Sequence, residues 1–280
     1  MSFFSAEVRA VARLDLADAL RSRWMLFSTF LYAVLGATFV LVGMRESTVV
    51  GFSGIGRVLL SMIHALLLIL PLLALTATSQ VVNRARDDGT LELIFSQPVR
   101  RTAYFLAVTV TRFLMLVVPL VVVMVSMAAI AAAVFDEAVS WSFLFQSIGV
   151  CAALITAYVG IGMAVSTFVR SQARSVIWTL TIFALGAAFL DFGLIGLMLR
   201  WQLNAPTIFL LASLNPVQAA RMALLVGAST ELSVLGPVGF FLAHRLGPIL
   251  LFGLGIAWPA MLGLGAWLWA RSTFARADIV

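Results

Sequence analysis

The chain has 280 residues, of which 62% are hydrophobic and only 11% are charged, with a formal net charge of +6. Soluble domains average about 45–50% apolar residues on a wider count that includes glycine, so an ordinary soluble protein is excluded. The 18 basic residues are all arginine; a P-loop needs a lysine on the phosphates and a Schiff-base enzyme needs one as nucleophile, so both are excluded for this chain. The composition predicts an all-α, polytopic membrane protein with one membrane domain.

The N-terminal segment, residues 1–23, carries four arginines and three acids. It is too long and too charged for the n-region of a signal peptide, so the first span is expected to stay uncleaved. Phe4, Val8 and Val11 share one helical face, which Asp15 continues. This weakly amphipathic pattern predicts a cytoplasmic interfacial helix that lies on the inner membrane surface. Contact with a cytoplasmic partner is the alternative.

The remaining residues, 24–280, contain six stretches that are apolar enough to cross a bilayer. The third is longer than one crossing requires, so it is expected to tilt, to kink at Pro119 or to extend beyond the bilayer. The six predicted transmembrane helices run approximately over residues 24–44, 58–82, 103–135, 143–169, 175–199 and 246–270.

Arginine placement predicts the orientation of these spans. With the N-terminus inside, thirteen arginines fall in cytoplasmic segments and five fall outside. This positive-inside bias predicts that both termini are cytoplasmic. The net positive charge follows from the topology and gives no reason to expect a nucleic-acid partner.

A short charged passage, residues 83–101, separates the second and third predicted spans and contains four arginines and three acids. Within it, Leu91, Ile94 and Phe95 fall at i, i+3 and i+4, which is one face of a short helix. Gly89 precedes this turn and a proline follows it, and both residue types interrupt helices. The pattern predicts a small amphipathic helix whose apolar ridge binds a groove of another protein. The alternative is a solvated loop that rests on lipid headgroups.

The region before the last span, residues 200–245, contains an apolar stretch that Asn215 and Pro216 divide. Asparagine is a good N-cap and proline suits the first helical position, so a helix is expected to begin there and to end near Gly227. Each apolar piece has only about ten residues, too few to cross the hydrocarbon core. This favours a re-entrant outer segment.

Asp191 is the main acidic residue inside a predicted span. A carboxylate at a helix centre costs about 2.5–3.5 kcal/mol on insertion scales, so it is expected to face water or a dimer interior. It is a candidate cavity-lining or partner-coupling residue, and the alternative is a structural acid near the interface. The methionines, histidines and single cysteine form no clustered array of copper ligands, so no metal site is predicted. No motif for nucleophilic or acid–base catalysis is present.

Residues 86–92, Arg-Asp-Asp-Gly-Thr-Leu-Glu, followed by residues 97–100, Gln-Pro-Val-Arg, carry a resemblance to a known family. They are similar to the coupling segment of the ABC-2 type permeases, which runs from acidic-Gly-Thr-Leu to Pro-x-x-Arg. Residues 15–24, 190–192 and 213–221 most resemble the NosY-type members, which are associated with maturation of nitrous oxide reductase and multicopper enzymes.

The resemblance implies that residues 24–280 form a six-span ABC-2 permease domain in a bacterial inner membrane, with a coupling segment at 83–102 and the re-entrant segment at 200–245. A separate ATPase subunit would bind ATP and Mg, so this chain is expected to be a non-enzymatic permease without a cofactor of its own. The implied partners are that subunit, a second permease copy in a homodimer, membrane lipid and a periplasmic maturation protein. The implied ATPase-coupling residues are Arg86, Asp87, Asp88, Gly89, Thr90, Leu91, Glu92, Ile94, Phe95, Arg100 and Arg101. The implied cavity or partner-coupling residues are Asp191, Asn215 and Arg221.

Two other functions have the same or a related architecture. An ABC-2 exporter of a drug, lipid or other hydrophobic cargo would look alike, because a fold does not determine its cargo. A secondary transporter would usually show internal repeats and several ionisable groups near the midplane, where this sequence offers chiefly Asp191. The sequence therefore favours an ABC permease, either for metalloenzyme maturation or for export.

Overall fold

The computed structural model describes residues 2–21, 23–46, 54–135, 140–189, 205–228 and 247–276. These residues form helices joined by short turns, and none of them lies in a strand, which confirms the all-α prediction for the described part of the chain. The elements are α1 (Ser2–Arg21), α2 (Arg23–Glu46), α3 (Gly54–Thr78), α4 (Val81–Asp87), α5 (Thr90–Phe95), α6 (Arg101–Phe135), α7 (Trp141–Phe168), α8 (Gln172–Phe183), the π-helix η1 (Ala184–Phe189), α10 (Ala205–Leu214), α11 (Pro216–Ala228) and α13 (Pro248–Arg276).

Among the described residues, four helical stretches are long and apolar enough to cross a membrane. They are Met62–Asp87 of α3 and α4, Arg101–Ile130 of α6, and the whole of α7 and α13. These stretches correspond to the second, third, fourth and sixth predicted spans. The first predicted span falls in α2, whose shorter apolar part is Trp24–Thr38. The fifth predicted span, 175–199, begins in α8 and η1 and continues outside the described residues.

Helix α6 is 35 residues long. At 1.5 Å per residue it measures about 52 Å, well beyond a hydrocarbon core of about 30 Å. It continues through Pro119 as one helix. Its first turns pack against α1, and Arg112 pairs there with a charged residue of that helix. A helix of this length leaves tilt and extension beyond the bilayer as the explanations that the sequence offered, since no kink interrupts it.

Helix α7 is the centre of the fold, because it packs against α3, α6, α11 and α13. Its contact with α13 is close: Gly160 of α7 and Gly263 of α13 face each other with no room for a Cβ on either residue. Lipid tails are as apolar as leucine, so helices in a membrane associate through such close packing of small residues. The two glycines therefore set the distance between α7 and α13.

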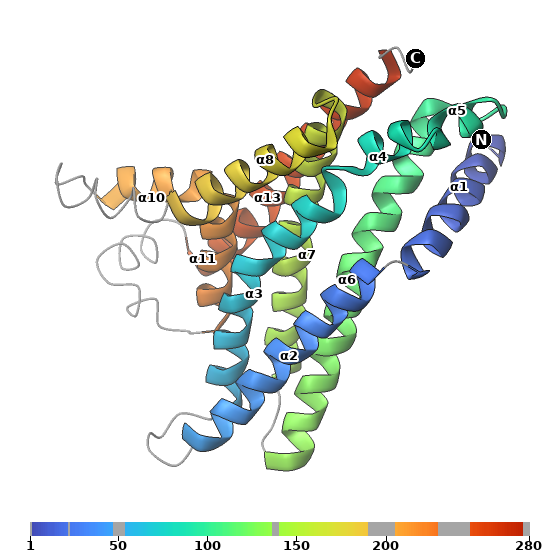
Figure 1. The fold of residues 1–280 in the computed structure, drawn as a ribbon. Coiled ribbons are helices and arrows are strands. Elements are labelled where there is room, and N and C mark those ends of the chain that lie inside the picture. Colours follow the sequence, from blue (N-terminus) through green and yellow to red (C-terminus); the bar gives the residue numbers. More distant parts are fainter. Residues whose placement is uncertain are drawn as a thin grey trace.

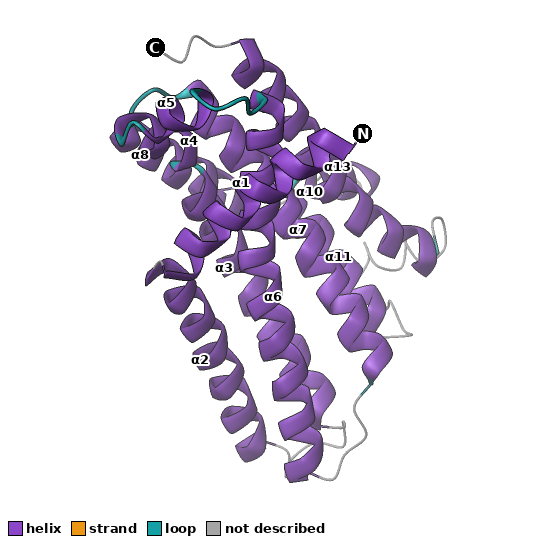
Figure 2. Ribbon diagram, turned by 90° about the vertical axis from the view of Figure 1, so that its right-hand side faces the viewer, coloured by secondary structure: helices purple, strands orange, loops and turns teal. Residues whose placement is uncertain are grey.

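The long helices run side by side, and one end of the bundle gathers the start of α1, the end of α13, α4 and α5 (Figure 1). A view turned by 90° shows α4, α5 and α8 near one another at that same end (Figure 2). The two ends of the described chain thus lie at one end of the bundle.

Candidate functional site

The 83–102 segment contains most of α4, a turn at Gly89 and all of α5 before it enters α6. Gly89 has a φ of 69°, a left-handed conformation that glycine adopts without the steric penalty of a side chain. Helix α5 follows at once as Thr90–Phe95, and Pro98 lies beyond its end. The predicted short helix between Gly89 and Pro98 is confirmed.

The apolar face of α5 is turned toward this chain's own helices. Leu91 is 1% exposed, and Ile94 and Phe95 are partly buried against the hydrophobic core. Leu93 points away from that core and is 72% exposed. Of the ridge that the sequence predicts as a contact for another protein, Leu91 is therefore covered within the chain, and Ile94 and Phe95 are partly covered. Helical spacing shows which residues share a face, but the neighbouring helices decide what covers it. Leu93 is the large apolar side chain that α5 presents outward.

An aromatic cluster covers the inner face of α5. The ring centroids of Phe95 and Tyr104 lie 5.7 Å apart in an edge-to-face arrangement. Phe274, near the end of α13, lies 6.1 Å from Tyr104 and 5.3 Å from Phe105. Such aromatic pairs contribute about 0.5–1.5 kcal/mol each beyond the burial of their surface. The cluster attaches α5 to the start of α6 and to the end of α13.

Two hydrogen bonds fix the end of the 83–102 segment. The backbone N–H of Arg100 donates to Glu7 Oε2 of α1 at 3.3 Å. The Nη1 of Arg101 donates to the backbone carbonyl of Ala275 in α13, also at 3.3 Å. Helices α1 and α13, which are far apart in the sequence, therefore both contact the 83–102 segment.

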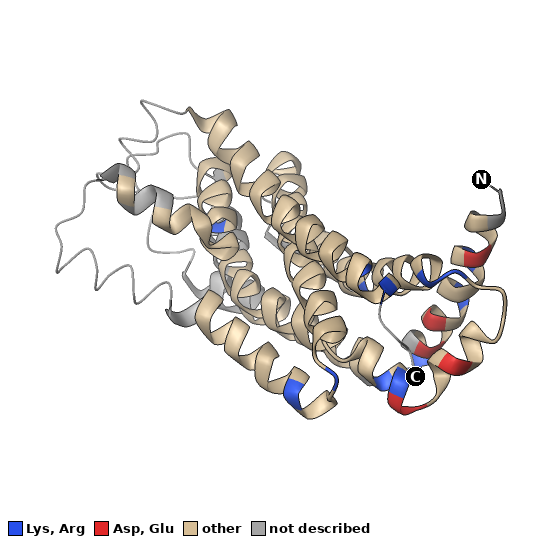
Figure 3. Ribbon diagram, turned by 90° about the horizontal axis from the view of Figure 1, so that it is seen from above, with Lys and Arg blue, Asp and Glu red and all other residues tan. Residues whose placement is uncertain are grey.

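The outward side of the segment carries charges of both signs. Asp87, Asp88 and Glu92 are exposed, and so are Arg84 and Arg100. Seen from above, the acidic residues of the described chain lie together near the two labelled termini (Figure 3). Asp87 also accepts a hydrogen bond at 2.6 Å from Gln172 Nε2, at the start of α8. An exposed leucine among charged side chains is a surface that suits a partner with an apolar groove and a rim of complementary charges.

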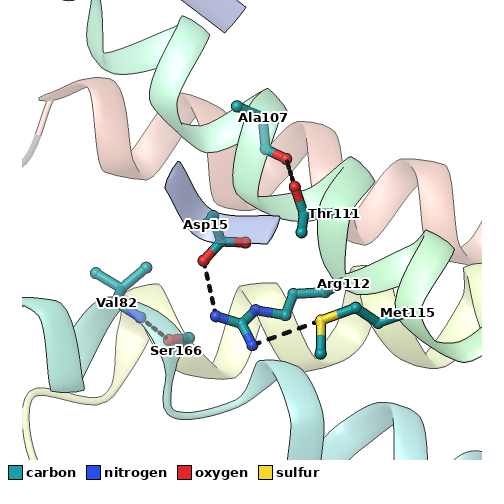
Figure 4. Close-up of polar contacts among 7 residues, drawn as sticks. All are labelled: Asp15, Val82, Ala107, Thr111, Arg112, Met115 and Ser166. Carbon is teal, nitrogen blue, oxygen red and sulfur yellow. Dashed lines mark hydrogen bonds and ion pairs between the residues drawn. The ribbon is translucent and has the colours of Figure 1, made fainter. Parts of the chain in front are cut away.

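Helix α1 is held against α6 by an ion pair. Asp15 Oδ1 and Arg112 Nη2 lie 2.8 Å apart, and Arg112 also approaches the Met115 sulfur (Figure 4). Burial raises the pKa of Asp15 above its usual value, Arg112 opposes this rise, and nearby Asp18 adds to it. Val11 is buried one turn earlier. The predicted face of α1 therefore packs on α6, and the charge of Asp15 is paired there with that of Arg112.

The region before the last apolar helix contains a helix break at the predicted position. Asn215 lies between α10 and α11, and its Oδ1 accepts from the backbone N–H of Val217 at 3.0 Å. The helix begins at Pro216 and ends at Ala228, so the predicted N-cap, helix start and approximate helix end are confirmed. Asn215 Nδ2 donates to the carbonyl of Gly186 in η1 at 2.7 Å. This residue thus joins α11 to η1.

The other predicted site residues lie apart from the 83–102 segment. Arg221 is on α11, where its Nη1 donates to Gln218 Oε1 at 3.4 Å. Helix α11 packs against α3, α7 and α13. Asp191 lies outside the described residues. The structure therefore brings all eleven predicted coupling residues together in one segment, and places Asn215 and Arg221 together on a different element.

Several contacts of this site carry no local sequence signal. Glu7, Gln172 and Phe274 all touch the 83–102 segment, yet each comes from a distant part of the chain. Sequence patterns identify neighbours one or two helical turns away, so they could not predict these contacts between distant parts of the chain. Gln172, Ser175 and Thr179 do share one face of α8, a pattern that is visible in the sequence.

An apolar groove lies between α11 and α13. It is lined by residues that include Leu214, Met222, Leu254 and Trp258. The indole N–H of Trp258 donates to the carbonyl of Leu214 at 3.2 Å, which connects the two walls. Within the described ranges, no three His, Cys, Asp or Glu side chains come together as a candidate metal site.

A family model described as ABC-2 family transporter protein matches residues 9–278. The probable ABC transporter permease protein NosY of Stutzerimonas stutzeri is 31% identical over 143 residues, which are 51% of each chain. A protein of the same description from Pseudomonas aeruginosa is 31% identical over 94 residues, 34% of each chain. The matched stretches thus span about half of these relatives or less. The family model covers nearly the whole chain, so the protein belongs to the ABC-2 family of transporter proteins.

Proposed function

We propose that this chain is the permease subunit of an ABC transporter and that it couples ATP hydrolysis by a separate ATPase subunit to transport or to mechanical work on a periplasmic partner. ABC-2 permeases work with ATPase subunits. The absence of lysine from the sequence supports the division of labour, because a P-loop lysine must come from another chain. ATP and Mg would be bound there.

The 83–102 segment is the observation that carries this proposal. Its outward side presents Leu93 among exposed charged side chains, while Leu91 and the aromatic cluster bind its inner side to α6 and α13. A force applied to the outer side is therefore delivered to helices that are long enough to cross the membrane. Exposed charges contribute to the register and rate of docking more than to its affinity. Leu93 would supply the apolar contact.

The remaining parts of the proposal follow the predicted topology. Six spans, with both termini in the cytoplasm of a bacterial cell, place the 83–102 segment on the side where ATP is available. The α10–α11 segment would then be a re-entrant outer element that meets the periplasmic partner. The exposed row of Val110, Leu114, Val118 and Val122 on α6 suits contact with lipid. A homodimer would provide one permease for each of two ATPase subunits.

Maturation of a metalloenzyme, such as nitrous oxide reductase, is the proposed task. The support is the similarity to relatives named as NosY permeases. In the sequence, residues 213–221 carry part of that likeness, and the structure gives their first half a defined geometry around Asn215. Neither the groove nor the described polar residues are needed as a metal site in this scheme, because the chain would act on a protein partner.

The coupling role is tested by Leu93→Asp, with the complex purified from native membranes. We expect the ATPase subunit to associate roughly tenfold more weakly, since a charge at a central apolar contact costs at least about 1.4 kcal/mol. The matched control is Leu14→Asp, because Leu14 is 65% exposed and lies on α1 instead. Equal ATPase association in both variants and the parent would defeat the coupling assignment.

The periplasmic role is tested by what co-purifies with the parent chain. An ATPase together with a periplasmic protein supports maturation, and an ATPase alone supports export. The groove beside Trp258 favours export of a hydrophobic cargo as the second candidate. Leu254→Trp would fill this groove, so it should reduce export while leaving work on a periplasmic protein unchanged.

A further inference from the structure

Three hydrogen bonds between side chains, which we call the polar ladder, join the passage from α3 to α4 with helix α8. No sequence motif of the family resemblance includes the α8 side of these bonds. The rungs are Thr179 Oγ1 to Ser79 Oγ at 2.7 Å, Asn83 Nδ2 to Ser175 Oγ at 2.8 Å, and Gln172 Nε2 to Asp87 Oδ2 at 2.6 Å.

The rungs repeat once per helical turn on both sides. On one side the residues are 79, 83 and 87, and on α8 they are 179, 175 and 172. Residues three or four apart lie on the same face of a helix, which aligns 83 with 87 on α4 and 172, 175 and 179 on α8. Ser79, in the turn just before α4, extends the first row through its own hydrogen bond to α8. The numbers rise on one side as they fall on the other, and the two rows therefore run antiparallel. This regular pairing distinguishes the ladder from scattered surface hydrogen bonds.

Two of the three rungs are sealed from solvent. Ser79, Asn83 and Ser175 are 0% exposed and Thr179 is 1% exposed. A buried polar group that loses its partner keeps its full desolvation penalty, so these rungs strongly disfavour separation of the two rows. If the two rows slid past each other, the buried groups would lose their partners before they reached new ones, and would carry the same desolvation penalty. The ladder therefore resists both kinds of displacement.

A further hydrogen bond fixes the break between α3 and α4. The backbone N–H of Val82 donates to Ser166 Oγ, near the end of α7, at 2.8 Å (Figure 4). This N–H lies in the first turn of α4, where the helix itself supplies no acceptor. Ser166 is 0% exposed. The start of α4 is thus oriented by α7 while its side chains pair with α8.

The ladder forms the covered side of α8. Ser175 and Thr179 are the buried residues of this helix. In contrast, Ile177, Trp178 and Leu180 are 63%, 49% and 54% exposed. Apolar packing alone therefore holds α8 only weakly within the described part of the chain, and the polar rungs determine its position.

We propose that the polar ladder holds α4 and α8 as one rigid unit, so that a displacement of the 83–102 segment is passed through α8 and η1 to Asn215 at the head of α11. The last step uses the hydrogen bond from Asn215 Nδ2 to Gly186 in η1. This route rests on the proposed function and supplies its connection from the ATPase side to the outer segment. Ser79, Asn83, Ser175 and Thr179 are then positioning residues for coupling.

Hydrogen–deuterium exchange of the complex with its co-purified ATPase subunit, with and without ATP, tests the route. The double variant Ser175→Ala/Thr179→Val removes both buried rungs while nearly preserving side-chain volume. We expect ATP to change exchange in residues 83–102 as in the parent. The ATP-dependent change in residues 172–189 should fall roughly threefold or more, since its hydrogen-bonded connection is gone.

A matched control is available on the same helix. Thr181 is exposed, and its hydroxyl donates only within α8, to the carbonyl of Ile177 at 2.8 Å. Thr181→Val should leave the ATP response of both segments unchanged. If the double variant keeps the parent response in 172–189, the ladder proposal is overturned although the ATPase still binds. If no ATPase co-purifies even with the parent chain, the proposed function itself fails, and the route with it.

A disulfide in place of the first rung tests rigidity. Ser79→Cys and Thr179→Cys, in a Cys151→Ala background, place two thiols where the hydroxyls now meet. A rigid unit predicts that ATP turnover of the oxidised complex stays within roughly twofold of that of the reduced complex. Turnover that is lost on oxidation and restored by reduction means that the two rows move past each other, and this result overturns the proposal.

Discussion

Asp15 Oδ1 and Arg112 Nη2 lie 2.8 Å apart and join α1 to α6 across 97 positions of the sequence. The side chains are only 15% and 19% exposed, so water solvates neither charge fully. Removal of one partner from such a pair leaves the other charge buried and uncompensated, which is more harmful than loss of both. The ion pair therefore decides where the N-terminal helix docks, beside the entrance to the 83–102 segment.

Asp15→Ala is expected to lower the free energy of unfolding by about 1–3 kcal/mol, because Arg112 loses its anion. The double variant Asp15→Ala/Arg112→Leu should recover part of this loss. Thermal unfolding of the detergent-purified chain measures both effects. If the double variant is less stable than Asp15→Ala by the full effect of Arg112→Leu, the two residues are not coupled.

The pH dependence of stability follows from the burial of Asp15. Its pKa is raised above the ordinary value of 3.8, so the folded state binds the proton more readily than the unfolded state. The contribution of Asp15 to the free energy of unfolding is fully present below its pKa in the unfolded chain. It is lost as pH rises through the higher pKa that Asp15 has in the folded protein. The Tm of the parent relative to Asp15→Asn should therefore increase when pH falls from about 7 to about 4.5. Parallel curves of Tm against pH for the parent and Asp15→Asn would contradict the raised pKa of Asp15.

The contact between α7 and α13 predicts a strong difference between two glycines on the same helix. Gly263 abuts the backbone of α7, whereas nothing lies within 4 Å of a Cβ placed on Gly265. Gly263→Ala should destabilise the chain by about 1–3 kcal/mol through overpacking. Gly265→Ala should be neutral or stabilising by up to about 1 kcal/mol, because alanine favours helix. Similar Tm values for the two variants would show that the helices readily move apart.

The two leucines of α5 should separate folding from binding. Leu91→Ala removes a side chain that is 1% exposed and should cost about 2–5 kcal/mol of stability. Leu93→Ala alters a 72% exposed side chain and should change stability by no more than about 0.5 kcal/mol. The second variant should nevertheless retain less ATPase subunit. Measurements of Tm and of ATPase yield on the same preparations decide between this assignment and a contact ridge that includes Leu91.

The cap of α11 provides a further test. Asn215→Ala removes the acceptor for the Val217 N–H and should cost about 0.5–2 kcal/mol. Asn215→Ser keeps a capping oxygen and loses the donor to Gly186, so it should be less destabilising. Thermal unfolding compares the two variants. Equal losses would mean that the bond to Gly186, rather than the cap, accounts for the stability that Asn215 provides.

Features that act through the local backbone were predictable from the sequence. Gly89 interrupts the chain before α5, and Asn215 with Pro216 starts α11, because caps and turns depend on residues a few positions apart. Continuous hydrophobicity likewise predicted four of the spans as long apolar helices. The shared face of Leu91 and Phe95 was also predictable, since helical periodicity determines it.

Other features were set by helices that meet only in the folded chain. The aromatic residues of α6 and α13 cover the inner face of α5, and this left Leu93 as its outward apolar contact. Periodicity gives no sign of which face will be covered, because coverage depends on other helices, including α13 at the far end of the chain. The same holds for Asp15, whose place on an apolar face makes sense only beside Arg112.

The sequence by itself determined that this chain is helical and strongly apolar, where its short helices begin, and that it has no lysine for a P-loop. Hydropathy, capping and residue identity are properties of single positions and near neighbours. The tertiary structure alone decided which side of α5 is free, and it aligned two polar rows, at Ser79 to Asp87 and at Gln172 to Thr179, into one ladder. Hydrogen bonds between distant helices require both partners to arrive at matching positions, and only the packing of α7 against its neighbours brings them there.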